Sequence, residues 1–69
     1  MDIYVAWMQL NEYETEPYNI GVYSTKEKAE DAILEALREA NQEALTLEIY
    51  ESQEEPYYIF GVEQYILDD

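Results

Sequence analysis

The chain has 69 residues, of which 17 are Asp or Glu and three are Lys or Arg, so its formal net charge is −14 at pH 7. It contains no His and no Cys, which excludes an imidazole base, a thiolate nucleophile, a disulfide and the usual zinc ligands. Direct binding to DNA or RNA is not expected, because phosphate contacts require Lys and Arg. No stretch approaches the ~20 apolar residues of a membrane span. The start, Met1-Asp2, predicts no signal peptide, so we expect a cytoplasmic protein.

A folded chain is expected despite this charge. High net charge with few apolar residues would predict disorder, but apolar residues make up 48% of the chain and include eight Tyr and one Trp. We therefore predict a single small domain over residues 1–69. A chain this short has a thin core, worth typically ~3–5 kcal/mol of net stability. Self-repulsion at this charge subtracts from that stability.

The first predicted element is a strand over residues 2–10. Both of its faces are apolar, which favours a central position in a sheet. An acidic loop follows over residues 11–18, and residues 19–23 form a short strand in which Gly21 marks a bulge or a close backbone approach. The two faces of the first strand carry Ile3, Val5 and Trp7 on one side and Tyr4, Ala6, Met8 and Leu10 on the other.

A helix is predicted over residues 25–43. Ser24-Thr25-Lys26-Glu27 fits a capping box, in which the Ser24 hydroxyl and the Glu27 carboxylate each accept a backbone N–H of the other residue. Apolar residues follow at spacings of three and four, so one face packs on a sheet. They are mostly Ala, which lets the helix lie close to that sheet: Ala29, Ala32, Ile33, Ala36, Leu37, Ala40 and Ala44.

Two further strands complete the predicted fold. Leu45, Leu47 and Ile49 alternate with polar residues and Tyr50, which predicts a half-buried strand. A second acidic loop at 51–56 leads to a last strand over residues 57–67. The order ββαββ predicts an α+β fold, with a four-stranded, mainly antiparallel sheet and one helix packed on one face.

The sheet face without a helix has three interpretations. It would carry a selection of Tyr4, Met8, Leu10, Tyr23, Tyr50, Tyr57 and Tyr65. Tyr occurs at half-exposed sheet positions by propensity alone. An apolar patch on so small a protein also suggests a homodimer, through this face or an edge strand, or a partner-binding surface.

No motif carries catalytic chemistry. A glycosidase needs two carboxyl groups flanking a cleft, one with a raised pKa, whereas the acids here lie in loops and on an exposed helix face. Calcium loops require a Gly and a distal Glu in register, and Glu12-x-Glu14-x-Glu16 has neither. We therefore expect no enzyme, no cofactor and no dedicated metal site.

The acids of the predicted helix form a row with like charges at i,i+4: Glu27, Asp31, Glu35, Glu39 and Glu43. Each such pair costs a few tenths of a kcal/mol, and an ordinary exposed helix would alternate signs. The row rises ~6 Å per step, at roughly the scale of phosphates every ~3.4 Å along a DNA strand. All three cations lie between residues 26 and 38. Mimicry of a polyanion explains this pattern; solubility or a halophilic origin would also explain the excess charge.

One segment of the sequence is similar to a motif of other proteins. It spans residues 21–33 and reads Gly-Val-Tyr-Ser-Thr-Lys-Glu-Lys-Ala-Glu-Asp-Ala-Ile. This segment resembles a sequence motif of short, uncharacterised bacterial and phage proteins. In those proteins a Tyr-rich strand and an acidic loop precede the motif. The similarity covers residues 1–35 and implies a small α+β domain of bacterial or phage source, without an activity. In size and charge the chain is similar to phage-encoded DNA-mimic inhibitors, including some anti-CRISPR and anti-restriction proteins.

These observations favour a non-enzymatic inhibitor that mimics a nucleic-acid polyanion and blocks a basic nucleic-acid-binding protein or ribonucleoprotein. The alternatives are a small dimeric adaptor that binds through the Tyr-rich sheet face, and an antitoxin-like neutraliser of a basic partner. The predicted partner-binding residues are the helix row Glu27, Asp31, Glu35, Glu39 and Glu43, with auxiliary acids at the loop tips: Glu12, Glu14, Glu16, Glu51, Glu54 and Glu55.

Overall fold

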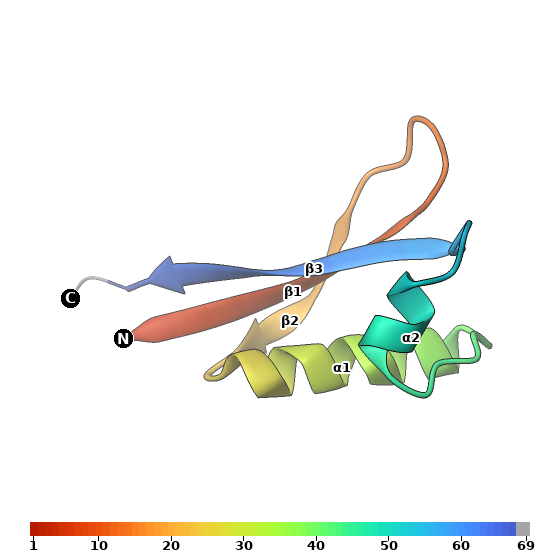
Figure 1. Ribbon diagram of the computed structural model, residues 1–69. Coiled ribbons are helices and arrows are strands. Elements are labelled where there is room, and N and C mark those ends of the chain that lie inside the picture. The colour runs from red at the N-terminus through yellow and green to blue at the C-terminus, as the bar shows by residue number, and fades with distance from the viewer. Residues whose placement is uncertain (68–69) are drawn as a thin grey trace.

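Three strands and two helices make up the fold of the computed structural model, which describes residues 1–67. In chain order they are β1 (Asp2–Leu10), β2 (Tyr18–Tyr23), α1 (Lys26–Glu39), α2 (Leu47–Glu51) and β3 (Tyr58–Ile66) (Figure 1). The strand order is β2-β1-β3, and both outer strands pair antiparallel with β1. The α+β class and the central position of β1 are confirmed. The prediction of four strands is wrong.

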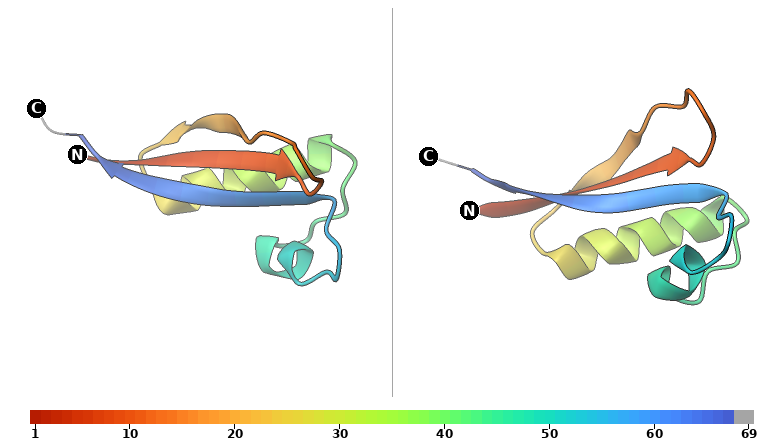
Figure 2. Two further views of the ribbon diagram at one scale, coloured as in Figure 1. Left: turned by 90° about the horizontal axis from the view of Figure 1, so that it is seen from above. Right: turned by 45° about the horizontal axis from the view of Figure 1, so that its top comes forward.

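Both helices lie on one side of the sheet (Figures 1 and 2). Because β2 and β3 are both antiparallel to β1, they run parallel to each other and need a crossover connection. That connection carries α1 across the sheet, where it contacts all three strands, and then α2, which packs beside α1. No helix among residues 1–67 is long and apolar enough to cross a membrane.

Residues 47–51 form α2, not the strand predicted at 45–50. Thr46 is the N-cap, and its hydroxyl oxygen accepts the Ile49 N–H at 3.1 Å. Leu47 and Tyr50 then lie one helical turn apart and face the core, whereas Leu45 and Ile49 are 77% and 54% exposed. The alternation of apolar residues is therefore accidental. The Thr cap and the three-residue spacing decide the conformation.

Tyr50 ties α2 to the rest of the fold. Its side chain is 1% exposed, and its hydroxyl donates to Gln42 Oε1 at 3.0 Å while accepting the backbone N–H of Tyr58 at 3.1 Å. The ring lies against Phe60, with a centroid distance of 6.2 Å. One side chain thus joins the loop after α1, the helix α2 and the start of β3.

The ends of α1 differ from the predicted 25–43. The N-cap is Thr25, whose hydroxyl oxygen accepts the Lys28 N–H at 3.1 Å, so the predicted Ser24–Glu27 capping box is wrong by one residue. At the other end Asn41 has a φ of 64°. The Gln42 N–H donates to Leu37 O at 2.9 Å, and the Asn41 N–H to Arg38 O at 3.0 Å. This is a Schellman motif, which Asn accommodates because it tolerates a left-handed backbone.

The core lies between α1 and the even-numbered side of β1. Small residues at Ala6 and Ala29 allow the helix to approach the sheet closely, and larger side chains fill the space around them. The predicted open face is therefore largely wrong. Met8 and Tyr50 belong to the core, Tyr4 and Tyr23 pack against it, and Leu10 shares the covered side through its pairing with Tyr58. Of that predicted set, the residues that are exposed are Tyr57 and Tyr65.

The pairing of β1 with β2 shifts by one residue between Ala6 and Trp7. Ala6 pairs with Gly21 and Trp7 with Asn19, which leaves Ile20 as the extra residue of a bulge. Ile20 packs against the core. The prediction of an irregularity at Gly21 is confirmed, and its effect is to add Ile20 to the covered side of the sheet.

Candidate functional site

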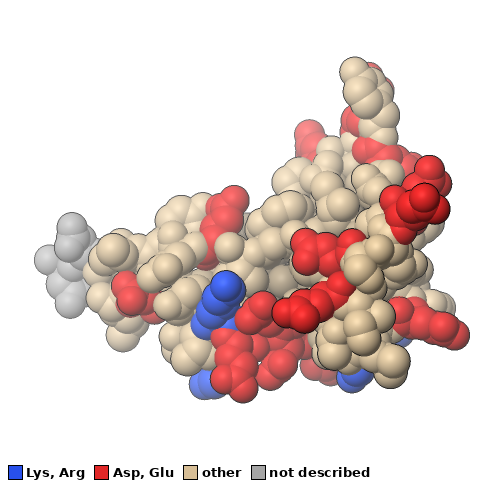
Figure 3. Space-filling model, in the orientation of Figure 1, with Lys and Arg blue, Asp and Glu red and all other residues tan. Residues whose placement is uncertain are grey.

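Acidic side chains cover the helices and one end of the molecule (Figure 3). Every Asp and Glu among residues 1–67 is exposed, and the core described there contains no charged residue. This arrangement suits a surface that meets a solvated partner.

The outer face of α1 carries four of the five acids predicted for the helix row. Glu27, Asp31, Glu35 and Glu39 are exposed, on the side of the helix away from Ala29, Ile33 and Leu37. Each step of four residues advances about 6 Å along the helix axis. The fifth acid, Glu43, lies in the loop after the Schellman motif, so the prediction that it extends the helical row is wrong.

All three cations belong to α1. The Arg38 guanidinium Nε donates to the carbonyl oxygen of Ala44 at 3.1 Å and so holds the loop between the helices. Lys28 Nζ donates to the Ser24 hydroxyl at 3.5 Å, near the start of the helix. Arg38 therefore has a structural role, because it satisfies a backbone carbonyl beyond the helix end.

The two acidic loops meet at the same end of the sheet. The Asn11 backbone N–H donates to Tyr57 O at 2.9 Å, and its side-chain amide donates to Pro56 O at 3.0 Å. Glu12 and Glu55 consequently line one surface pocket. We call the acids of these loops the loop-end cluster: Glu12, Glu14, Glu16, Glu54 and Glu55. Glu51, predicted as a tip residue, is instead the last residue of α2.

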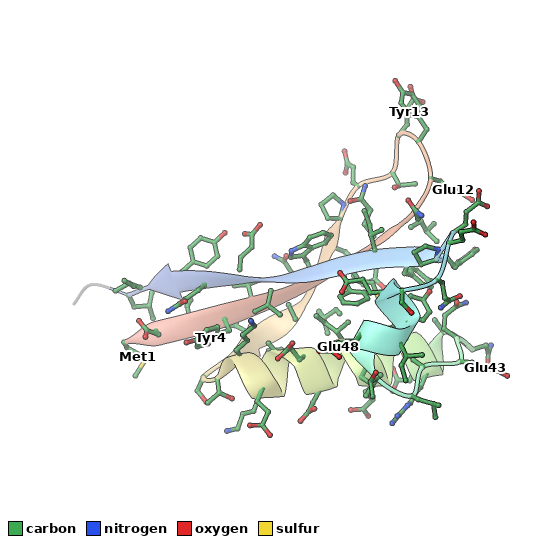
Figure 4. The ribbon with its side chains drawn as sticks, viewed as in Figure 1. Met1, Tyr4, Glu12, Tyr13, Glu43 and Glu48 are labelled. Atoms are coloured by element: carbon green, nitrogen blue, oxygen red, sulfur yellow. The ribbon has the colours of Figure 1, made fainter. Side chains whose placement is uncertain are left out.

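Hydrogen bonds hold the first acidic loop in shape. The Thr15 hydroxyl donates to Leu10 O at 2.8 Å, and Gln9 Nε2 donates to Thr15 O at 2.7 Å. Glu14 turns the chain with a φ of 65°. At the tip, Tyr13 is 93% exposed and points away from the sheet (Figure 4). The sequence analysis did not select Tyr13, although an aromatic residue within an acidic loop is a recognisable signal.

A groove between α1 and α2 brings together acids that are distant in sequence. Glu30 and Asp31 from α1 and Glu48 from α2 line it, together with three Leu side chains: Leu34, Leu45 and Leu47. Figure 4 shows Glu48 on α2 and Glu43 on the loop that precedes it. Glu30 and Glu48 were not predicted as site residues, because the predicted strand at 45–50 would have separated them.

Two tyrosines have altered acidity. Burial raises the pKa of Tyr58, and the neighbouring Tyr18, Tyr57 and Tyr50 add to this effect. The hydrogen bond that the Tyr65 hydroxyl donates to the Glu63 carboxylate raises the pKa of Tyr65. Both groups therefore stay protonated at neutral pH, and neither has the lowered pKa of an activated nucleophile.

Among residues 1–67 there is no group of three or more carboxylates arranged to hold a metal ion. Comparisons with protein families, curated proteins and solved structures find no match for this chain. Proposals about its function therefore depend on the geometry described above.

Proposed function

We propose that this protein is a non-enzymatic inhibitor that mimics a nucleic-acid polyanion and binds a cationic nucleic-acid-binding protein or ribonucleoprotein. The observation that supports it is the excess of exposed acids. The row on α1 and the loop-end cluster are both exposed, and all three cations lie on α1, so the loop-end cluster contains no positive charge. The proposal includes a phage anti-defence role in the bacterial cytoplasm, such as anti-CRISPR or anti-restriction activity, and a homodimer.

The helical row supports mimicry because its charges are preorganised. A helix holds carboxylates at fixed spacing, so little entropy is lost when a rigid cationic groove binds them. The loop-end cluster has the same advantage to a lesser degree, since Thr15, Gln9 and Asn11 restrain the loops. Exposed charges of this kind chiefly accelerate association and are screened beyond ~8 Å at physiological salt.

Tyr13 adds an apolar contact to the charged surface. Tyrosines are enriched among the residues that dominate binding energy, because they bury a large area at low entropic cost. A partner that surrounds the loop end would bury this ring between Glu12 and Glu14. We therefore include Tyr13 in the proposed binding surface, with the row on α1 and the loop-end cluster.

Affinity capture with DNA elution tests the proposal. The protein is immobilised, exposed to a nuclease-treated bacterial lysate at low salt, and then washed with excess duplex DNA. A mimic and DNA require the same cationic surface, so we expect DNA to release the captured proteins. Captured proteins that stay bound in excess DNA would use a different surface, and the proposal would be wrong.

A further inference from the structure

The uncovered face of the sheet is apolar and carries little charge. It consists of the odd-numbered side of β1 and the residues paired with it. Val22, Tyr65 and Ile59 are 60%, 49% and 37% exposed on this face. Together with the half-buried side chains of β1, they form what we call the open-face patch: Ile3, Val5, Trp7, Val22, Ile59 and Tyr65.

Trp7 lies flat at the centre of this patch. A Cβ atom at Gly61 would meet Cζ2 of the Trp7 indole at 2.7 Å, so the ring rests directly on the β3 backbone. Only a glycine leaves room for this arrangement. Trp7 also lines a shallow pocket with Asn19 and Glu63, and Val22 and Ile59 lie on the flanking strands.

Charge is nearly absent from this face. Among the strand positions on this side of β1, β2 and β3, Glu63 is the one that carries a charge. Its carboxylate accepts a hydrogen bond from the Tyr65 hydroxyl. Elsewhere the chain carries acids on both helices and both loops. A basic partner would find little to pair with here, whereas an identical uncharged face would be complementary.

We propose that a second copy of this chain packs on the open-face patch, sheet against sheet, to form a two-fold dimer. This names the interface of the homodimer included in the proposed function, and it does not depend on the inhibitory activity. Packed sheets lie about 10 Å apart, and each α1 lies on the far side of its own sheet. The two acidic rows are then separated by more than two Debye lengths of about 8 Å, so the repulsion between these rows is largely screened. The acidic loop between β1 and β2 rises on the same side of the sheet as the patch, so its acids lie nearer the second copy (Figure 1).

The size of the face predicts a weak dimer. Three strands about 4.8 Å apart and up to nine residues long, at ~3.3 Å each, give a flat area of about 400 Å². Side-chain relief increases the accessible area, but it remains below the ~800 Å² per partner of a standard interface. We therefore expect a dimer that dissociates on dilution into the low micromolar range.

Sedimentation equilibrium across micromolar to millimolar concentrations tests this directly. We expect the mass to rise from 8.2 kDa toward twice that value. Added salt should strengthen the dimer, because it screens the repulsion between the chains. Salt should weaken capture of a cationic partner, so the two proposals fail in distinguishable ways. A monomer at every concentration and salt would overturn the dimer.

A matched pair of lysine variants locates the interface. Val22→Lys adds one positive charge at the open-face patch, and Leu45→Lys adds the same charge at a 77% exposed site in the loop before α2. Both changes reduce the net negative charge and so lessen general repulsion. We expect Val22→Lys to weaken dimerisation at least tenfold, and Leu45→Lys to leave it unchanged or stronger. Equal behaviour of the two variants would overturn the proposal.

The single tryptophan gives a test without substitution. Trp7 lies within the proposed interface, and the chain contains no other Trp. Its fluorescence should become less accessible to acrylamide over the concentration range in which the mass doubles. Unchanged quenching through that range would mean that the copies associate elsewhere, and would also overturn the proposal.

Discussion

Single side chains hold this small fold together at defined points. The Tyr50 hydroxyl forms hydrogen bonds with both the loop after α1 and the start of β3. The Arg38 guanidinium donates a hydrogen bond to the carbonyl oxygen of Ala44. A domain of this size has few kcal/mol of net stability, so each of these contacts is a large part of the total. The residues that matter most for folding are therefore distinct from the exposed acids proposed to bind a partner.

Tyr50→Phe should destabilise the protein by about 1–3 kcal/mol. The ring would still fill its site, but the Tyr58 N–H would lose its acceptor and Gln42 its donor. Urea unfolding followed by far-UV circular dichroism measures the change. Tyr57→Phe is the control, because Tyr57 is 54% exposed, and it should have little effect. Equal stability of the two variants would contradict the role of the buried hydroxyl.

Stability should decrease at alkaline pH. The pKa of Tyr58 is raised from its ordinary value of 10.0 by burial, and that of Tyr65 by the bond to Glu63. Each group ionises at lower pH in the unfolded chain, so unfolding releases protons as the pH rises above 10.0 and its free energy falls. Tyrosine ionisation, followed by absorbance at 295 nm during a pH titration, should show tyrosines that ionise only above pH 10.0 in the folded protein. Tyr65→Phe should have one fewer of them. Eight tyrosines titrating together at 10.0 would contradict this account.

At the scale of elements, the sequence predicts three strands and the main helix well and misses what lies between them. The alternation in β1 and β3 and the 3–4 spacing in α1 are long patterns that many residues support. The end of α1 depends on one residue, Asn41, and the start of α2 on one residue, Thr46. Such signals are short, and the alternation of Leu45, Leu47 and Ile49 obscured them. The sequence does not show which face of β1 the helices cover, because both faces of this strand are apolar.

Thr25→Ala should cost about 1 kcal/mol of stability, because the Lys28 N–H at the start of α1 would lose its acceptor. Ser24→Ala should cost clearly less, since the Ser24 hydroxyl makes only a long hydrogen bond of 3.5 Å with Lys28 Nζ within the described residues. Comparing the thermal unfolding of the two variants shows whether Thr25 or Ser24 is the N-cap of α1. A larger loss for Ser24→Ala would restore the capping box and contradict the cap at Thr25.

On the scale of the whole molecule, the acids of the helices and the open-face patch lie on opposite sides of the sheet (Figure 1). Acids also cover the loop end, where the loop between β1 and β2 rises on the side of the patch (Figures 1 and 3). The sequence predicted the positions of the helical row, except for Glu43, and of the loop acids, except for Glu51, which ends α2. It could not predict that Asn11 joins the two loops, or that Glu30 and Glu48 share a groove, because these contacts form only in the folded chain.

Replacing Asp31, Glu35 and Glu39 by Asn, Gln and Gln should leave the fold intact or slightly more stable, because it relieves i,i+4 repulsion. The same variant should associate more slowly with a captured partner. Replacing the exposed acids Asp2, Glu48 and Glu63 by Asn, Gln and Gln removes an equal charge outside the proposed binding surface and is the matched control. Stopped-flow association at low salt compares the two. Equal slowing would mean that net charge alone governs binding and that the helical row has no special role.

The central claim is that this protein and a nucleic acid compete for one cationic surface. The most direct test is fluorescence anisotropy of a labelled DNA duplex bound to a protein captured from the lysate, during titration with the unlabelled inhibitor. We predict complete displacement of the duplex, with a half-displacing concentration that increases in proportion to the DNA present. A ternary complex in which the duplex stays bound would contradict mimicry.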